Sequence, residues 1–230
     1  MKRFLPPILV LLLLTCTAFA GLDWPVDKHV YSNGLTLLTL EDHSTPSISF
    51  QIWYHVGSKN ERPGITGISH LFEHLMFMGT NKVGPEDFSK IIQKNGGISN
   101  AYTTWDMTVY HEDFGVNQLE QVLDLESDRL QHLKLDEKNL ASERQVVLEE
   151  RGFRVENSQF QDVLEQLFAN AWMAHPYSWM TIGWRPDVEP NKIVPPFNFT
   201  FDFHWCKCLC SSIDLVAENV SGMGRDIDCR

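Results

Sequence analysis

The stretch that decides the fold reads Gly67-Ile68-Ser69-His70-Leu71-Phe72-Glu73-His74-Leu75-Met76-Phe77. It predicts a helix over residues 68–78 that ends at Gly79. On that helix His70 and His74 are four residues apart and project from one face, so two imidazole nitrogens can reach one zinc ion at about 2.0–2.1 Å. Glu73 lies on the same side, where its carboxylate can act on a water molecule at the metal without binding the metal itself.

The His-x-x-Glu-His pattern is the inverted form of a common zinc-site helix, and it needs a third protein ligand elsewhere. A candidate run reads Glu143-Arg144-Gln145-Val146-Val147-Leu148-Glu149-Glu150. Glu143 and Glu150 are two helical turns apart and share a face, and Val146 and Val147 between them could pack against the first helix. From the residues alone, a solvated acidic helix face explains this run equally well.

Strands are predicted on both sides of the motif. The expected ranges are residues 34–40, 47–56, 98–104 and 107–114. In the second range, alternate residues from Ile48 to Tyr54 are apolar, which indicates one buried face.

Further helices are predicted from Pro85, from a capping box formed by Asn117 and Glu120, over residues 137–155 and over residues 159–172. Strands precede helices, and the strands can form hairpins. We therefore expect an α+β fold, a mainly antiparallel sheet with helices packed on one face.

Composition narrows the class of protein. The chain has 230 residues, of which 43% are hydrophobic and 21% charged, which is typical of a folded protein able to bury a core. Its formal net charge is −11 without a basic cluster, which argues against a nucleic-acid partner. Five cysteines are too few for a small disulfide scaffold.

The first twenty residues have the pattern of a secretory signal peptide. Lys2 and Arg3 precede an apolar run over residues 5–14, and Ala18-Phe19-Ala20 offers a cleavage site. We expect an exported protein, periplasmic or secreted, with no stable membrane insertion after cleavage. An uncleaved N-terminal anchor is one alternative, and a lipoprotein attached at Cys16 is another.

These features together resemble the insulinase/pitrilysin family of zinc peptidases, which includes the mitochondrial processing peptidases. The resemblance begins at Gly57, runs through the histidine motif to Gly79-Thr80, and covers about residues 30–189. In that family the third ligand is a glutamate far downstream, and its spacing matches Glu150, 76 residues after His74. A family Asn-Ala pair on an edge strand matches Asn100 and Ala101.

The resemblance implies a zinc-dependent metalloendopeptidase that hydrolyses extended peptides or small proteins. One Zn²⁺ per chain would be held by His70, His74 and Glu150, with Glu73 as the general base and Glu143 supporting the site. The substrate backbone would add as a strand beside Asn100, Ala101 and Tyr102.

Members of the family resemble two similar halves facing each other, and this chain matches only the zinc-bearing first half. The resemblance therefore implies a further partner: a second half-module, a homologous subunit or self-association. Two alternatives to an active peptidase are a non-catalytic peptide-binding subunit and an incomplete fragment.

The pattern ends near Glu189, so the expected organisation is a signal peptide at residues 1–20, a zinc-peptidase half at 21–189 and an off-pattern tail at 190–230. The tail holds Cys206, Cys208, Cys210 and Cys229. We interpret it as a shifted reading frame or a truncation. Sequencing the transcript would test this, and a continuous, correct frame would contradict it.

Overall fold

The structure is a computed structural model that describes residues 25–189 and 213–218. The predicted signal peptide and the cysteines of the tail lie outside these residues. Within the described ranges, none of the helices combines the length and apolar character needed to cross a membrane.

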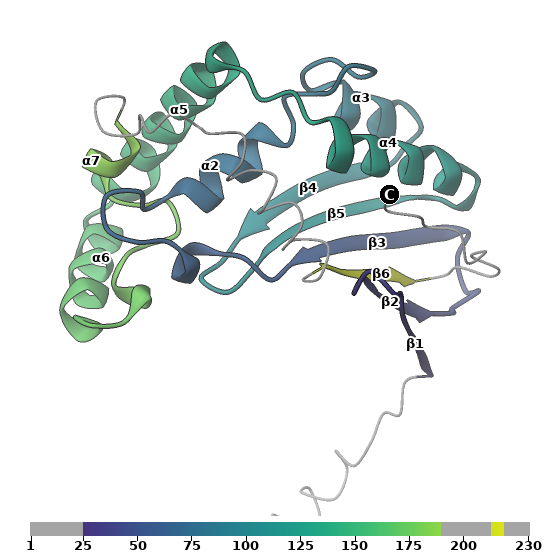
Figure 1. Ribbon diagram of the computed structural model, residues 1–230, viewed down its shortest axis with the longest axis horizontal. Helices are drawn as coiled ribbons and strands as arrows, with labels where there is room; N and C mark the ends of the chain where they lie inside the picture. Colours follow the sequence, from purple (N-terminus) through teal and green to yellow (C-terminus); the bar gives the residue numbers. More distant parts are fainter. Residues whose placement is uncertain (1–24, 190–212, 219–230) are drawn as a thin grey trace, which may run out of the picture.

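Six strands form one sheet (Figure 1). They are β1 (Val26–Val30), β2 (Thr36–Leu40), β3 (Ser47–Tyr54), β4 (Ile98–Thr103), β5 (Thr108–Gly115) and β6 (Ile213–Glu218). Their order across the sheet is β1-β2-β6-β3-β5-β4. All neighbours run antiparallel except β2 and β6, which are parallel.

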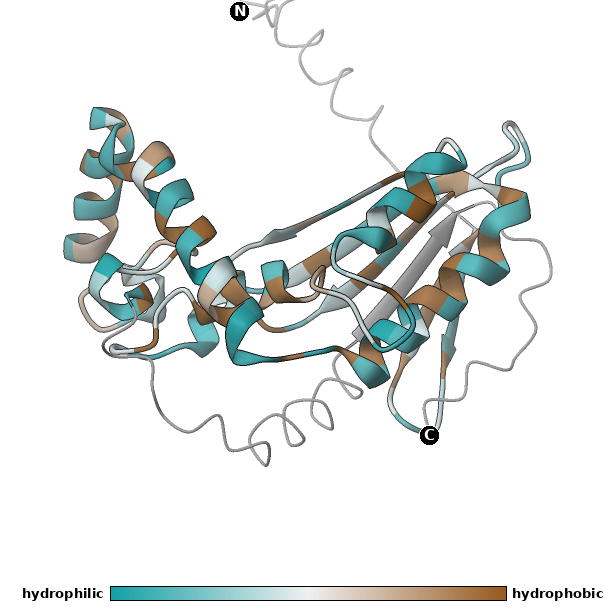
Figure 2. Ribbon diagram, turned by 90° about the horizontal axis from the view of Figure 1, so that it is seen from above, coloured by the Kyte–Doolittle hydropathy of each residue, from teal (hydrophilic) through white to brown (hydrophobic). Residues whose placement is uncertain are grey.

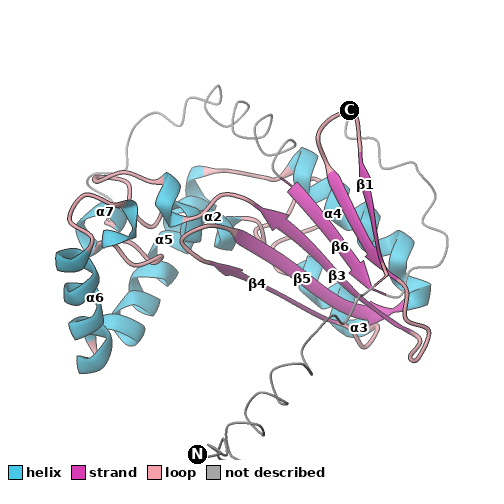
Figure 3. Ribbon diagram, turned by 90° about the horizontal axis from the view of Figure 1, so that it is seen from below, coloured by secondary structure: helices cyan, strands magenta, loops and turns pink. Residues whose placement is uncertain are grey.

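The helices are α2 (Ile68–Leu75), α3 (Asp87–Lys94), α4 (Leu119–His132), α5 (Glu137–Arg151), α6 (Gln159–Ala171) and α7 (Arg185–Val188). Figure 1 shows α2, α3 and α4 over one face of the sheet, while α5, α6 and α7 gather at one end. The view from below shows the sheet in front of α3 and α4, with α5, α6 and α7 beside one end of it (Figure 3). The predicted α+β fold with helices on one face is confirmed.

Two hydrophobic clusters meet at α2. The larger lies between the sheet and helices α3 and α4, and it includes the alternate residues of β3 from Ile48 to Tyr54, as predicted. The smaller joins α2 to α5 and α7. Phe72 of α2 packs against both clusters, so the motif helix is wedged between the sheet and the helical end of the molecule. Coloured by hydropathy, the helices carry both brown and teal residues, as expected when one side is buried (Figure 2).

The prediction that Asn117 caps a helix is wrong. Residues Val116–Gln118 form a 3₁₀ turn, and α4 begins at Leu119 with Gln118 at the N-cap. The side chain of Gln118 is buried and its Nε2 donates to the carbonyl of Asn95 at 3.0 Å. The side chain at the N-cap therefore makes a tertiary hydrogen bond and does not cap the helix.

Several element bounds also differ from the prediction. The motif helix ends at Leu75 instead of residue 78, and the helix predicted over 137–155 changes at Gly152 into a short π-helix (Gly152–Glu156). β1 was not predicted. β6 lies within the range assigned to the off-pattern tail and pairs with β2 and β3.

Candidate metal centre

Helix α2 presents two imidazole rings one turn apart. The ring centroids of His70 and His74 are 4.8 Å apart at an interplanar angle of 75°. Leu71 and Leu75, on the adjacent side of the helix, are buried in the smaller cluster against α5. The amphipathic pattern of α2 therefore both seats the helix and directs the two histidines along one side.

Helix α5 brings the third ligand candidate to these rings. Its N-cap Asp136 accepts a hydrogen bond from the backbone of Asn139 at 2.7 Å. Val147 is fully buried in the cluster that contains Leu71 and Leu75, whereas Val146 is 43% exposed, so only one of the two valines packs as expected. This packing brings the next turn of α5, with Glu150, alongside α2.

Glu150 lies between the two histidines. Its Oε2 is 3.5 Å from Nε2 of His70 and 3.4 Å from Nε2 of His74. One ligand atom from each residue lies within 4.8 Å of the others. Among the described residues, this is the group of His, Cys or acidic side chains close enough together to hold a metal ion.

Outer contacts orient this group. Glu143 Oε2 is 3.2 Å from Nδ1 of His74, on the ring side opposite Glu150. Arg154 Nη1 is 2.9 Å from Oε1 of Glu150. One carboxylate oxygen of Glu150 is therefore held by an arginine, while the other faces the imidazoles. A carboxylate on the second ring nitrogen, as Glu143 is for His74, fixes the tautomer and ring orientation of a metal-binding histidine.

The three side chains fit a zinc ion. Glu150 Oε2 is buried and has no hydrogen-bond partner among the described residues. A buried acceptor left in that state costs about 1–3 kcal/mol, which a cation at this point would offset. Two imidazole nitrogens and one carboxylate oxygen are also the donor set of hydrolytic zinc sites that keep a fourth position open.

Glu73 approaches the same place from α2 and is held from the sheet. Its Oε2 accepts a hydrogen bond from the Thr103 hydroxyl at the end of β4. The Thr108 hydroxyl lies 3.4 Å from that of Thr103 and donates to the Val56 carbonyl at 3.0 Å. Glu73 is thus oriented by the strand at the edge of the sheet. Sequence reasoning missed Thr103 and Arg154. Arg154 had a local signal, because it lies four residues after Glu150.

The electrostatics separate the roles of these groups. Burial lowers the pKa of His70 to about 4, so its ring is neutral and able to bind a metal. Burial also opposes charge on His74, but its contacts with Glu150 and Glu143 outweigh that effect and raise its pKa. Contact with His74 lowers the pKa of Glu150. Burial raises the pKa of Glu73, partly offset by the Thr103 hydrogen bond, and a raised pKa suits a general base near neutral pH.

The residues predicted to bind substrate lie on β4 and are not part of the group of three ligand candidates. In the described residues β4 pairs only with β5, so its other edge is free. Asn100 Oδ1 accepts a hydrogen bond from the Ala101 backbone at 2.9 Å, and Tyr102 is 42% exposed. The Thr103–Glu73 hydrogen bond connects this free edge to the histidine motif.

Comparison with known proteins places this arrangement in a family. The family model for insulinase (peptidase family M16) matches residues 36–183, a range that includes every residue of the cluster. This chain belongs to the insulinase family of peptidases. The Zinc protease PqqE of Helicobacter pylori is 35% identical over 182 residues, which are 77% of this chain and 41% of that protein.

Solved structures agree with the family assignment. A protease from Helicobacter pylori superimposes with a TM-score of 0.78 at 31% sequence identity, covering 86% of this chain and 47% of that one. The periplasmic protease PqqL from Escherichia coli shares the fold, with a TM-score of 0.73 at 20% identity, over 88% of this chain and 23% of its own. This insulinase-family chain thus spans less than half the length of each of these proteins.

Proposed function

We propose that this chain is the zinc-bearing half of a metalloendopeptidase that hydrolyses extended peptides. The observation that carries the proposal is the convergence of His70, His74 and Glu150 on one point, with Glu73 beside it. Zinc bound there would lower the pKa of a water molecule to about 7 and polarise the scissile carbonyl.

The chain's own residues would supply the remaining chemistry. Glu73 would accept the proton of the attacking water and later deliver it to the leaving amine, and Thr103 holds one oxygen of that carboxylate. Glu143 would keep the His74 ring in place through Nδ1. A non-catalytic binding subunit would have no need of a buried carboxylate at the position of Glu73.

The free edge of β4 supports the proposed substrate class. An extended peptide can add to such an edge through main-chain hydrogen bonds, which tolerate many sequences. Asn100, Ala101 and Tyr102 would line the added strand. Because Thr103 ends β4 and contacts Glu73, a peptide paired with this strand would run past the general base.

We also propose a second half-module as the partner, supplied by another chain, a homologous subunit or self-association. The support is length: the chain spans 41% of Helicobacter pylori PqqE and 47% of the solved Helicobacter pylori protease. Export to the periplasm or beyond is a further proposal. It rests on the pattern of residues 1–20, which lie outside the described structure.

The test is hydrolysis of a quenched fluorescent peptide by the purified chain with added zinc. Glu73→Gln is expected to reduce kcat by about 10²–10⁴-fold while zinc stays bound at one equivalent. Glu149→Gln is the matched control, because Glu149 is an exposed acid on α5. Equal activity in Glu73→Gln would contradict the role of the general base. Zinc binding without turnover in the wild type would mean that a second half-module is needed.

A further inference from the structure

Helix α2 begins without a cap of its own. Its N-cap residue, Gly67, has a positive φ of 86°, and a Cβ atom there would lie 2.6 Å from the carbonyl oxygen of Ile182. Likewise, a Cβ atom on Gly183 would clash with the carbonyl oxygen of Thr66. The two segments pack so closely that Gly67 cannot be replaced by the usual capping residues. The first backbone N–H groups of α2 therefore need an acceptor from elsewhere.

Glu61 provides that acceptor from the preceding loop. Its Oε2 accepts from the backbone N–H of Gly67 and its Oε1 accepts from that of Ser69, both at 2.8 Å. Glu61 is 8% exposed, and its own backbone N–H donates to the Ser58 carbonyl. Trp179 Nε1 donates to the same carbonyl at 3.0 Å, which ties the loop to the helical end of the molecule. Both oxygens of a fixed, buried carboxylate thus hold the turn that carries His70.

The two histidines differ in how they are oriented. Glu143 holds the ring of His74 through Nδ1, whereas Nδ1 of His70 is buried without a hydrogen-bond partner among the described residues. The position of the His70 ring therefore depends on its rotamer and on the backbone of the first helical turn. That backbone is fixed next to His70 by the hydrogen bond from Ser69 to Glu61.

We propose that Glu61 is a positioning residue of the metal centre, which sets the first turn of α2 so that His70 meets the same ion as His74 and Glu150. This role rests on the proposed function, because it presumes that the three residues bind zinc. In this proposal Glu61 supports His70 through the backbone of α2, just as Glu143 supports His74 through a contact with its ring.

Asp187 offers a matched control. It is also 8% exposed, and its Oδ2 accepts from the backbone N–H groups of Gly64 and Thr66 and from the Thr66 hydroxyl, at 3.0, 3.3 and 2.7 Å. It anchors the same loop, but its contacts end one residue before the N-cap of α2. A general loss of loop stability should therefore affect both acids, whereas a loss of His70 positioning should affect only Glu61.

The experiment measures zinc affinity of the full chain by competition with a chelator, alongside urea unfolding without metal. Glu61→Gln replaces one acceptor by an NH₂ group, and it is expected to weaken zinc binding by about 10–100-fold. Asp187→Asn is expected to lower stability to a similar degree but to change zinc affinity by less than about threefold. The visible absorption of bound Co²⁺ should change in Glu61→Gln and stay the same in Asp187→Asn.

Glu61→Asp, which keeps the charge but is shorter by one methylene group, is the second variant if Glu61→Gln does not fold. It should weaken zinc binding in the same direction. Wild-type zinc affinity in the Glu61 variants, or an equal loss in Asp187→Asn, would overturn the inference and leave the proposed function standing. A wild-type chain that binds no zinc would instead remove the proposed function, and this inference with it.

Discussion

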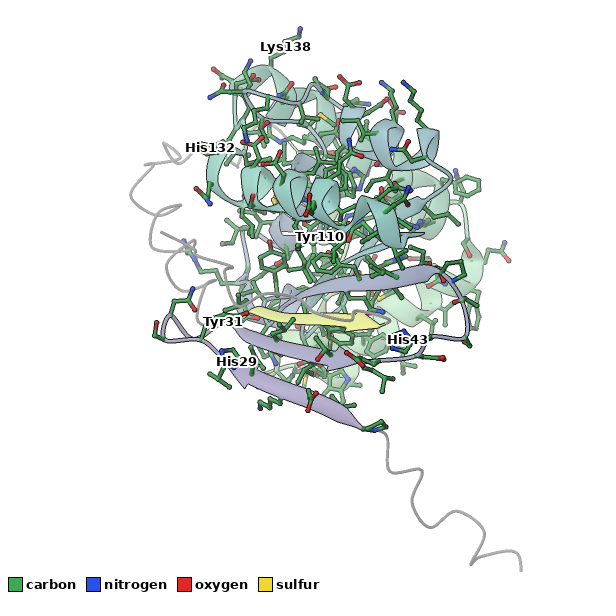
Figure 4. All side chains as sticks on the ribbon, turned by 90° about the vertical axis from the view of Figure 1, so that its right-hand side faces the viewer. His29, Tyr31, His43, Tyr110, His132 and Lys138 are labelled. Carbon is green, nitrogen blue, oxygen red and sulfur yellow. The ribbon has the colours of Figure 1, made fainter. Side chains whose placement is uncertain are left out.

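Two clusters of buried charged side chains compensate the cost of burying carboxylates in different ways. The arginine cluster, formed by Glu112, Glu126 and Arg129, lies between the sheet and α4. Arg129 donates to both oxygens of Glu126, and its Nη2 is 3.6 Å from Oε1 of Glu112. The guanidinium also lies 4.3 Å from the ring centroid of Phe88 and 4.5 Å from that of Tyr110, which Figure 4 labels between the sheet and the helices.

Among the described residues, the metal-site cluster, formed by His70, His74, Glu143 and Glu150, has no such cation inside it. Its arginine contact comes from Arg154, which is mostly exposed and binds the outer oxygen of Glu150. Among the described residues, the inner oxygen of Glu150 has no hydrogen-bond partner, and the same is true of both oxygens of Glu112, so the two clusters differ in where the cation lies and not in their unpaired oxygens. Arg129 lies between the carboxyl groups that it compensates, whereas Arg154 contacts only the outer oxygen of Glu150, which leaves the space between Glu150 and the two imidazole rings suited to receive a cation.

The largest effect on stability is expected when Arg129, the cation of the arginine cluster, is removed. Arg129→Met leaves two buried carboxyl groups without compensation, and removing one partner of a buried ion pair costs about 3–5 kcal/mol of unfolding free energy. Urea unfolding measures this loss. Lys90→Met is the control, because the exposed Lys90 lies 3.3 Å from the exposed Asp87 and such surface pairs contribute about 0–1 kcal/mol. An equal, small effect in both variants would remove the contrast between buried and exposed charge.

A smaller effect is expected at the metal-site cluster, where the compensating cation would be a bound zinc ion. Glu143→Leu removes the acceptor on Nδ1 of His74, and it should weaken zinc binding by about 10–100-fold, which is about 1.4–2.7 kcal/mol. Competition with a chelator measures the affinity. Glu149→Leu on the exposed side of α5 should leave the affinity unchanged. If the two variants bind zinc equally well, Glu143 does not support the metal site.

The effect that is smallest per pH unit concerns Glu112, the second carboxyl group of the arginine cluster. Burial and the nearby Glu126 raise the pKa of Glu112 well above its ordinary value, with Arg129 acting in the opposite direction. Above the ordinary pKa of about 4.3, the folded state keeps a proton that the unfolded state releases. The contribution of Glu112 to stability is then largest at low pH and falls as pH rises towards the folded pKa, by up to about 1.4 kcal/mol per pH unit.

Glu112→Gln should remove that slope, because an amide has no proton to lose in this range. Urea unfolding at about pH 5, 6 and 7 compares the variant with the wild type. The pH dependence that Glu150 contributes has the opposite sign. Because its pKa is lowered in the folded state, it adds stability above its ordinary pKa, and this contribution is lost as pH falls. A slope that persists in Glu112→Gln would place its origin elsewhere in the chain.

Much of the fold followed from local patterns. The alternation from Ile48 to Tyr54 predicted the buried face of β3, and the histidine motif predicted α2, because both depend on the repeat of a single element. The capping box at Asn117 misled, because residues Val116–Gln118 form a 3₁₀ turn that runs into α4, and Gln118 at the N-cap bonds to Asn95 instead of capping the helix. β1 escaped prediction: all five of its residues are exposed, so it lacks the alternation that marks a half-buried strand.

The sequence by itself determined that His70, Glu73 and His74 share one side of a helix, because helical spacing is a property of the backbone alone. It offered Glu150 as one acid in a run that a solvated helix face explains equally well, and only the family resemblance singled it out by its spacing, 76 residues beyond His74. Only the tertiary structure decided that Glu150 lies between the two rings, that Thr103 holds Glu73 and that Glu61 holds the start of α2. Such contacts join segments distant in the chain, and they depend on how α2, α5 and β4 pack together, which no local periodicity encodes.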